Sequence, residues 1–285
     1  MNVLSIQSHV AYGHVGNAAA VFALQRLGIE VWPIHTVQYS NHKGYGGWTG
    51  DDFSARHVAA LIDGLSARGV LGACDGVLSG YVGRAEIGAA IVDAVARVRR
   101  ANPAALYACD PVMGDDATGL YVESDLPAFF RARAMPLAHI ATPNRFELER
   151  LTDRRVETLA DAIGAARALN AMGPSVVLVT SLRHDRTAPD EIETLAVSPT
   201  GAWRVRAPLI PFDTAPNGAG DTIAALFLAH YLKTRDCPRA LEAAVAGIFA
   251  VLEATRAAGT RELALIAAQD AMVDPPRRFA AEPLA

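Results

Sequence analysis

The segment Asn217-Gly218-Ala219-Gly220-Asp221 joins a glycine turn to a carboxylate and runs directly into the apolar stretch Thr222–Phe227. Two glycines around one small residue let a tight turn expose backbone N–H groups. The following helix adds its own unpaired N–H groups and the positive end of its dipole. This combination predicts a site for an anion such as a phosphoryl group. Asp221 would act there as a base, taking the proton of a hydroxyl that attacks the bound phosphorus. The alternative is an Asp that caps a helix after an ordinary glycine turn.

The elements that must position this segment alternate short apolar runs with longer amphipathic stretches. Residues 175–180 are apolar on both faces, which is typical of a parallel strand covered by helices on each side. We expect strands at Val3–Ile6, Val31–Val37, Gly76–Ser79, Leu106–Cys109, His139–Thr142 and Ser175–Thr180, and an antiparallel hairpin at Glu191–Val197 and Ala202–Ala207. We expect helices at Ala18–Leu27, Val58–Ala67, Glu86–Arg100, Phe146–Leu151, Leu159–Met172, Thr222–Tyr231, Pro238–Arg256 and Glu262–Ala271.

This alternation predicts an α/β fold with a mainly parallel central sheet, helices on both of its faces and a small antiparallel hairpin. No repeat, linker or shift in composition divides the chain, so we expect one domain over residues 1–285. The tail from about Asp274 contains three prolines and two arginines, and we expect it to be loosely ordered.

Polar residues follow each expected parallel strand at the point where the strand ends. In open parallel sheets, ligands bind beyond the carboxyl ends of the strands, so these residues are candidates for one common site. They are Ser8 and His9, Ser40–His42, Ser79–Tyr81, Asp110, Asn144 and Glu147, and Thr180 and Ser181.

Asp110, Asn144 and Glu147 together predict a site for hydrated Mg²⁺, which prefers oxygen ligands and keeps several waters. Each also has a structural interpretation. Asp110 precedes a proline and could cap a turn, while Asn144 and Glu147 have the spacing of a helix capping box. Both interpretations can hold at once. The hydroxyls of Thr180 and Ser181 could donate to phosphate oxygens.

Composition and charge argue against several other classes of protein. A net charge of −4 gives no electrostatic footprint for nucleic acid or an anionic membrane. Cys74, Cys109 and Cys237 lack a CxxC pair, which argues against a disulfide framework or a zinc site. The N-terminus has no signal-peptide pattern, and no run of about 18 apolar residues could span a membrane. We therefore expect a cytoplasmic protein. Four histidines match no zinc motif: His9, His14, His35 and His42.

The segment Gly44–Gly50 is a glycine-rich loop with two aromatic residues. No Gly-Lys-Ser/Thr sequence follows it, so Lys43 is not the lysine of a P-loop. Tyr45 and Trp48 could cover a flat ring, or they could pin the loop to the core.

These residues carry a resemblance to the pyridoxal kinases of the ribokinase-like superfamily that runs over nearly the whole chain. The segment Val37–His42, followed by Gly44-Tyr45 and Trp48, is similar to the most distinctive part of that family. The other matching segments occur in the family's order: Ile6–Val10 with Gly13 and Gly16-Asn17, Ser79–Gly83, Asp110–Asp115, Thr142–Asn144 with Glu147, and the glycine turn before Asp221.

The resemblance implies ATP-dependent phosphorylation of the 5′-hydroxymethyl group of pyridoxal to pyridoxal 5′-phosphate. It assigns Asp221 as the base and Gly218, Ala219 and Gly220 as the anion hole. It places four residues at the vitamin: Ser8, His42, Lys43 and Tyr81. It places eight on the ATP and Mg²⁺ side, with Asp110 and Glu147 holding the metal through water: Asp110, Asp115, Tyr121, Thr142, Asn144, Glu147, Thr180 and Ser181. It also implies a monovalent cation such as K⁺ near the anion hole, and a cytosolic homodimer.

Three positions depart from the family's pattern. Ala219 replaces a Thr or Val, which matters little where the backbone binds. Lys43 stands where Thr is frequent, so a contact to the substrate is altered. Residues 212–217 follow the family loosely, which leaves the adenine contacts unassigned. A hydroxymethylpyrimidine-type kinase is one alternative function. A carrier that holds pyridoxal with slow or no turnover is another.

Overall fold

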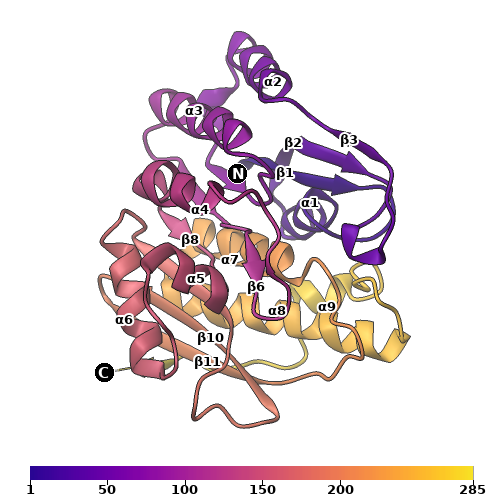
Figure 1. Cartoon of the computed structure of the whole chain (residues 1–285), viewed down its shortest axis with the longest axis vertical. Helices are drawn as coiled ribbons and strands as arrows, with labels where there is room; N and C mark the ends of the chain where they lie inside the picture. The colour runs from indigo at the N-terminus through magenta and orange to yellow at the C-terminus, as the bar shows by residue number, and fades with distance from the viewer. Residues whose placement is uncertain (285) are drawn as a thin grey trace.

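The computed structural model of the chain describes residues 1–284 and is built on one large sheet (Figure 1). Within that range the sheet has ten strands, in the spatial order β12-β11-β10-β9-β8-β5-β4-β1-β2-β3. Their bounds are β1 Asn2–Val10, β2 Glu30–Tyr39, β3 Gly50–Asp52, β4 Gly76–Ser79, β5 Leu106–Cys109, β8 Ile140–Ala141, β9 Val176–Leu182, β10 Glu191–Ser198, β11 Gly201–Pro208 and β12 Glu282–Leu284. The six strands from β9 to β2 are parallel, and β3, β10, β11 and β12 run antiparallel to their neighbours.

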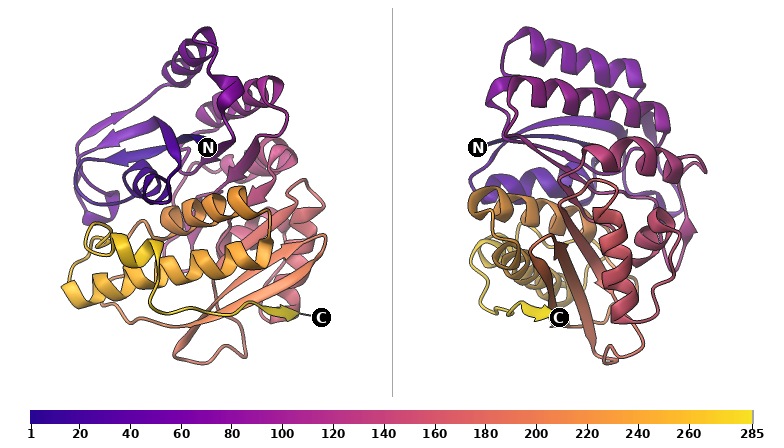
Figure 2. Two further views of the ribbon diagram at one scale, coloured as in Figure 1. Left: turned by 180° about the vertical axis from the view of Figure 1, so that it is seen from behind. Right: turned by 90° about the vertical axis from the view of Figure 1, so that its left-hand side faces the viewer.

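Helices cover both faces of this sheet, as the two views of Figure 2 show. One face carries α1 Asn17–Arg26, α7 Ala219–Thr234, α8 Cys237–Ala258 and α9 Gln269–Val273. The other face carries α2 Ala55–Ala67, α3 Ala85–Ala101, α4 Leu126–Phe129, α5 Arg145–Thr152 and α6 Leu159–Asn170. A separate ribbon of β6 Gly114–Asp115 and β7 Gly119–Leu120 lies outside the sheet. The prediction of a three-layer αβα fold is therefore confirmed.

Local sequence explains why these elements form and which side they bury. In α3 the buried residues Ile87, Ile91, Val95 and Val98 recur at helical spacing, so one stripe faces the sheet. In β9 four successive valine and leucine residues, 176–179, are buried because helices pack on both faces of that strand. The predicted hairpin is present as β10 and β11, paired in antiparallel register.

Two expectations about the C-terminal part are wrong. The helix expected at Glu262–Ala271 is present only as α9, from Gln269. Residues 262–268 instead bury Leu263 and Leu265 while Ile266 is 55% exposed, a spacing closer to two than to the helical 3.6.

The tail is ordered rather than loose. Residues 282–284 form β12 against β11, where the Glu282 carboxylate pairs with Arg204 and Arg206. The Phe279 ring lies edge-on to Phe249, with centroids 5.0 Å apart. The prolines and arginines suggested mobility by composition, but long-range pairing outweighs that local tendency. One domain over the whole chain stays our interpretation, in keeping with a continuous sheet.

The parallel strands bring their carboxyl ends to one edge of the sheet. The N–H of Asp110 donates to the carbonyl of Ser79, and the N–H of Thr142 donates to the carbonyl of Cys109. Asn144 and Thr180 form the next bridge along the row. Residues far apart in the sequence are thus neighbours at this edge.

Candidate active site

The glycine turn lies at the start of α7, as the sequence predicts. Gly218 has φ +89° and precedes the helix, whose first residues are Ala219, Gly220 and Asp221. A side chain on Gly218 would overlap the carbonyl oxygen of His14, whereas one on Gly220 would enter open space. The turn therefore presents backbone N–H groups, with nothing projecting from its exposed glycine.

Asp221 and Ser8 meet at Gly16, which has φ +55°. The N–H of Gly16 and the N–H of Asp221 itself donate to the Asp221 carboxylate and lower its pKa, but burial outweighs them and raises it. A helix N-terminus alone would keep this group a weaker base. A side chain on Gly16 would overlap the carbonyl and hydroxyl oxygens of Ser8. Gly16 therefore contacts both Ser8 and Asp221.

Aromatic residues form one wall beside this point. Tyr81 packs on a small apolar cluster that includes Tyr39, and its carbonyl accepts a hydrogen bond from Thr36. The Lys43 ammonium lies 4.9 Å from the Tyr39 ring centroid and 5.1 Å from that of Trp48. His42 caps the short turn that follows it, where its Nδ1 accepts the N–H of Gly44 at 3.1 Å. Of the residues predicted at the vitamin, Tyr81 and Lys43 are thus both packed around Tyr39.

Two buried carboxylates, Asp110 and Glu147, lie at the ends of the neighbouring strands. Asp110 is 6% exposed and Glu147 is 3% exposed. Burial raises the pKa of both groups, and the charges of Glu147 and Asp221 add to the effect on Asp110. Thr142 donates its hydroxyl to Asp110 at 2.9 Å. Asp110 therefore lies within the electrostatic influence of two further carboxylates, Glu147 and Asp221.

The structural interpretation of Asn144 and Glu147 is confirmed, while the Mg²⁺ interpretation stays a prediction. The Asn144 side chain accepts the N–H of Glu147 at 2.9 Å, and Glu147 accepts the N–H of Asn144 at 2.9 Å, which completes a capping box for α5. Glu147 also accepts the N–H of Met113 at 2.9 Å. The helix cap therefore fixes a carboxylate at the carboxyl edge of the sheet.

Asp115 and Tyr121 belong to the segment of β6 and β7. The Asp115 carboxylate accepts two backbone N–H groups and the hydroxyl of Thr118, so it closes its own turn. Tyr121 is 50% exposed, and burial followed by the charges of Glu147 and Asp221 raises the pKa of its hydroxyl. The charges of Glu147 and Asp221 thus act on the Tyr121 hydroxyl, whereas one oxygen of Asp115, Oδ1, is bound within its own turn.

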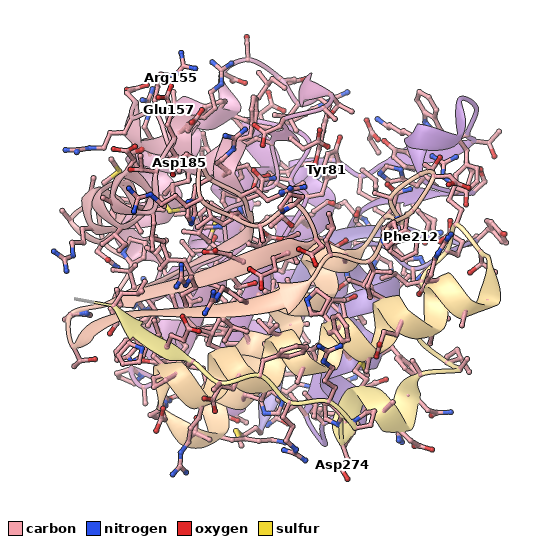
Figure 3. All side chains as sticks on the ribbon, turned by 90° about the horizontal axis from the view of Figure 1, so that it is seen from below. Tyr81, Arg155, Glu157, Asp185, Phe212 and Asp274 are labelled. Carbon is pink, nitrogen blue, oxygen red and sulfur yellow. The ribbon has the colours of Figure 1, made fainter. Side chains whose placement is uncertain are left out.

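Thr180 and Ser181 end the neighbouring strand, and Ser181 has the strained φ of +52°. Ser181 borders a cavity of about 450 Å³. The cavity is otherwise lined by charged side chains and a histidine: Asp116, Arg145, Glu157, Arg183, His184 and Asp185. In Figure 3, Glu157 and Asp185 lie together, apart from Tyr81 and Phe212.

Sequence reasoning missed Tyr39 as part of the aromatic wall. Its hydroxyl donates to Asp52, and burial raises its pKa. Its place at the end of β2, directly before the polar Ser40, was the available signal. In residues 1–284 no group of three or more His, Cys, Asp or Glu side chains converges as a ready metal site.

Comparisons with known proteins cover the whole chain. A family model described as Phosphomethylpyrimidine kinase matches residues 73–264. The chain is 56% identical over 285 residues to pyridoxal kinase PdxY of Deinococcus radiodurans, covering 99% of this chain and 96% of that one. It is 49% identical over its full length to pyridoxal kinase PdxY of Corynebacterium diphtheriae, which is also fully covered. The chain belongs to the pyridoxal kinase family.

Solved pyridoxal kinases agree with this assignment in their fold. The pyridoxal kinase of Leishmania donovani in complex with ADP and ginkgotoxin superposes with a TM-score of 0.92 at 32% identity, covering 100% of this chain and 99% of that one. The complex of the same kinase with ADP and pyridoxamine gives a TM-score of 0.91 at 31% identity and the same coverage. The resemblance seen in the sequence is confirmed. No helix within residues 1–284 is long and apolar enough to cross a membrane.

Proposed function

We propose that this chain transfers the γ-phosphoryl group of ATP to the 5′-hydroxymethyl group of pyridoxal. The observation that carries the proposal is the meeting of Ser8, Asp221 and the glycine turn around Gly16, at the N-terminus of α7. A hydroxyl bound beside Ser8 would have the base on one side and an anion hole next to it. The identity to pyridoxal kinases over the full chain supports the choice of substrates.

Asp221 takes the proton of the attacking hydroxyl in this proposal. Burial raises its pKa from the ordinary value of an aspartate, which makes the carboxylate a better proton acceptor than an exposed one. The N–H of Gly16 fixes the direction in which the carboxylate points. Phosphoryl transfer has a loose transition state, so a base that accepts the proton late suffices.

The backbone N–H groups of residues 218–220 stabilise the phosphoryl group as it moves. They are fixed before the substrate binds, because Gly218 packs on His14 and α7 packs on α1 and α8. Donors that need no reorganisation stabilise a transferring oxyanion more than water does. The open space over Gly220 leaves room for the phosphoryl oxygens.

The residues present fit a Mg²⁺ ion held through water. Burial raises the pKa of both Asp110 and Glu147, and the charge of Glu147 raises that of Asp110 further, so a bound cation would stabilise their ionised forms. When bound, the ion offsets negative charge on the leaving diphosphate. Thr142 orients Asp110, and the capping box orients Glu147. A K⁺ ion near the anion hole and a cytoplasmic homodimer remain part of the proposal.

The alternative of a hydroxymethylpyrimidine-type kinase draws on the description of the matching family model. That match begins at residue 73, so the aromatic wall of Tyr39 and Trp48 lies outside it. The curated pyridoxal kinases match this wall's part of the chain as well. Pyridoxal is therefore the substrate that the structure and the relatives support together.

The test is formation of pyridoxal 5′-phosphate by the purified chain with pyridoxal, MgATP and K⁺, with Asp221→Ala measured beside it. Formation of pyridoxal 5′-phosphate by the wild-type chain, together with its loss in Asp221→Ala, supports both the reaction and the role of Asp221 as base. Calorimetric binding of pyridoxal without turnover would point to a carrier. If pyridoxal does not bind either, hydroxymethylpyrimidine is tested as the substrate, and its phosphorylation would support the alternative kinase.

A further inference from the structure

Glu262, in the segment between α8 and α9, joins two loops of the site through one carboxylate. Its Oε1 accepts the hydroxyl of Tyr45 at 2.5 Å, and its Oε2 accepts the N–H of His14 at 3.0 Å. The carboxylate lies so close to Gly13 that a side chain there would overlap it. The partners are 217 and 248 residues away in the sequence.

The neighbouring residue, Arg261, also contacts this loop. Its Nη2 donates to the carbonyl of Gly44 at 2.7 Å, and its guanidinium lies 4.1 Å from the centroid of the Tyr45 ring. Cation–π contact and a hydrogen bond to the backbone thus add to the Glu262 contact.

These contacts add to those that join the loop to the end of β2, where the Asn41 side chain donates to the carbonyl of Gly47 and the N–H of Thr49 donates to the hydroxyl of Ser40. None of residues 43–50 is buried, so no apolar side chain fixes the loop to the core. Lys43, at the start of the loop, contacts the ring of Tyr39 and the ring of Trp48 near the loop's end. The segment between Lys43 and Trp48 contacts Arg261 and Glu262. Polar contacts therefore decide where this loop lies.

Glu262 also borders the anion hole. Its backbone forms an isolated parallel bridge with Asn217, the residue before Gly218. The N–H of His14 donates to Glu262, and the carbonyl of the same residue packs against Gly218. One residue therefore contacts the loop beside the vitamin pocket, the turn after β1 and the start of the glycine turn.

We propose that Glu262 is a positioning residue. It acts through Tyr45 to hold the loop 43–48 over the vitamin pocket, at a fixed position relative to the anion hole. The proposal rests on the proposed function, because it takes this loop to close on pyridoxal. Its consequence is specific to one substrate. Loss of the carboxylate frees Tyr45 and the N–H of His14 but leaves the backbone bridge at Asn217 in place.

The experiment compares Glu262→Ala, Glu262→Gln, Tyr45→Phe and the double variant Tyr45→Phe/Glu262→Ala in steady-state kinetics. We expect Glu262→Ala to raise the KM for pyridoxal roughly tenfold, the effect of one hydrogen bond to a charged group. The KM for ATP should change less than about twofold by the same reasoning. Glu262→Gln should remain close to wild type, because its amide can accept from His14 and donate to Tyr45.

The double variant tests whether the two residues act together. If Glu262 acts through Tyr45, the double variant is no worse than Glu262→Ala alone. Glu253→Ala is the matched control, since Glu253 is an exposed glutamate on α8. Fully additive effects, an unchanged pyridoxal KM, or equal losses for both substrates would each overturn the proposal.

Two measurements keep the test decisive. If Glu262→Ala fails to fold, Tyr45→Phe alone must still raise the pyridoxal KM by several-fold. Calorimetric binding of pyridoxal to each variant gives the same comparison without turnover. An inactive wild-type chain would contradict the proposed function, and the binding comparison would then decide about Glu262 separately.

Discussion

The carbonyl oxygen of His14 occupies the place where a side chain on Gly218 would begin. The turn after β1 and the turn before α7 therefore fit together only through a glycine with positive φ. Gly220, two residues further on, has open space where its side chain would be. The two glycines thus differ in their surroundings: Gly218 is fixed by close packing, whereas the proposed anion hole leaves space over Gly220.

This difference predicts opposite behaviour for two variants. Gly218→Ala should lower the free energy of unfolding by more than about 2 kcal/mol, because of both steric overlap and backbone strain. Gly220→Val should fold normally and lose turnover while the KM for each substrate changes little. Thermal unfolding and steady-state kinetics on both variants check this. A fully active Gly220→Val would contradict the role given to the glycine turn.

Removal of the proposed base should separate chemistry from binding. We expect Asp221→Ala to lower kcat by roughly 10²–10⁴-fold, the usual contribution of a positioned base. Pyridoxal and ATP should still bind, because the glycine turn and Ser8 do not depend on the carboxylate for their packing. Single-turnover kinetics and calorimetry measure the two effects. Near-normal turnover in a folded variant would remove Asp221 from the mechanism.

His139 predicts a loss of stability in mild acid. Burial, with Arg99 nearby, lowers its pKa from 6.5 to about 4, and its Nδ1 accepts the N–H of Tyr107 at 2.9 Å. The folded chain keeps the ring neutral, whereas the unfolded chain binds a proton below about pH 6.5. The unfolding free energy should therefore fall as the pH drops from 6.5 towards 4.

The variant His139→Gln isolates this contribution. Urea unfolding at about pH 7.5 and about pH 5 should show a smaller acid-induced loss for the variant than for wild type. Burial also lowers the pKa of His35 to about 4. His35 should therefore cause part of the acid-induced loss of stability in both the wild type and the variant. An equal loss in the two proteins would show that His139 is not responsible.

The ordered tail should contribute measurably to stability. Phe279→Ala removes a ring that packs on Phe249 and under the guanidinium of Arg277. We expect the unfolding free energy to fall by about 1–2 kcal/mol, since the ring is only partly buried. Val273→Ala, at a residue that is 37% exposed, is the control and should change it by less than about 0.5 kcal/mol. Equal effects would mean that the tail does not pack in solution.

The sequence predicted those features whose signal is local. Buried strands with apolar residues on both faces could be recognised, and Asp110 and Thr142 follow directly from the strand ends. The position of the glycine turn and of Asp221 at a helix start was predicted for the same reason, since one short segment contains the turn, the carboxylate and the first residues of α7.

Features that depend on distant partners could not be predicted. Nothing near Glu262 indicates that its carboxylate meets Tyr45, and its apolar neighbours imitate a helix. The tail looked mobile because Arg204 and Arg206, which pair with Glu282, lie more than 70 residues earlier. Sequence also does not show that one carboxylate oxygen of Asp115, Oδ1, accepts three hydrogen bonds within its own turn.

The two margins of the sheet share a property that concerns solubility. Among residues 1–284, β3 and β12 are the outermost strands, and each is three residues long. One consists of a glycine and two aspartates, and the other contains Pro283. Short, charged or proline-bearing outer strands resist pairing with strands of other molecules. The chain is thereby protected at both margins against growth of its sheet into aggregates.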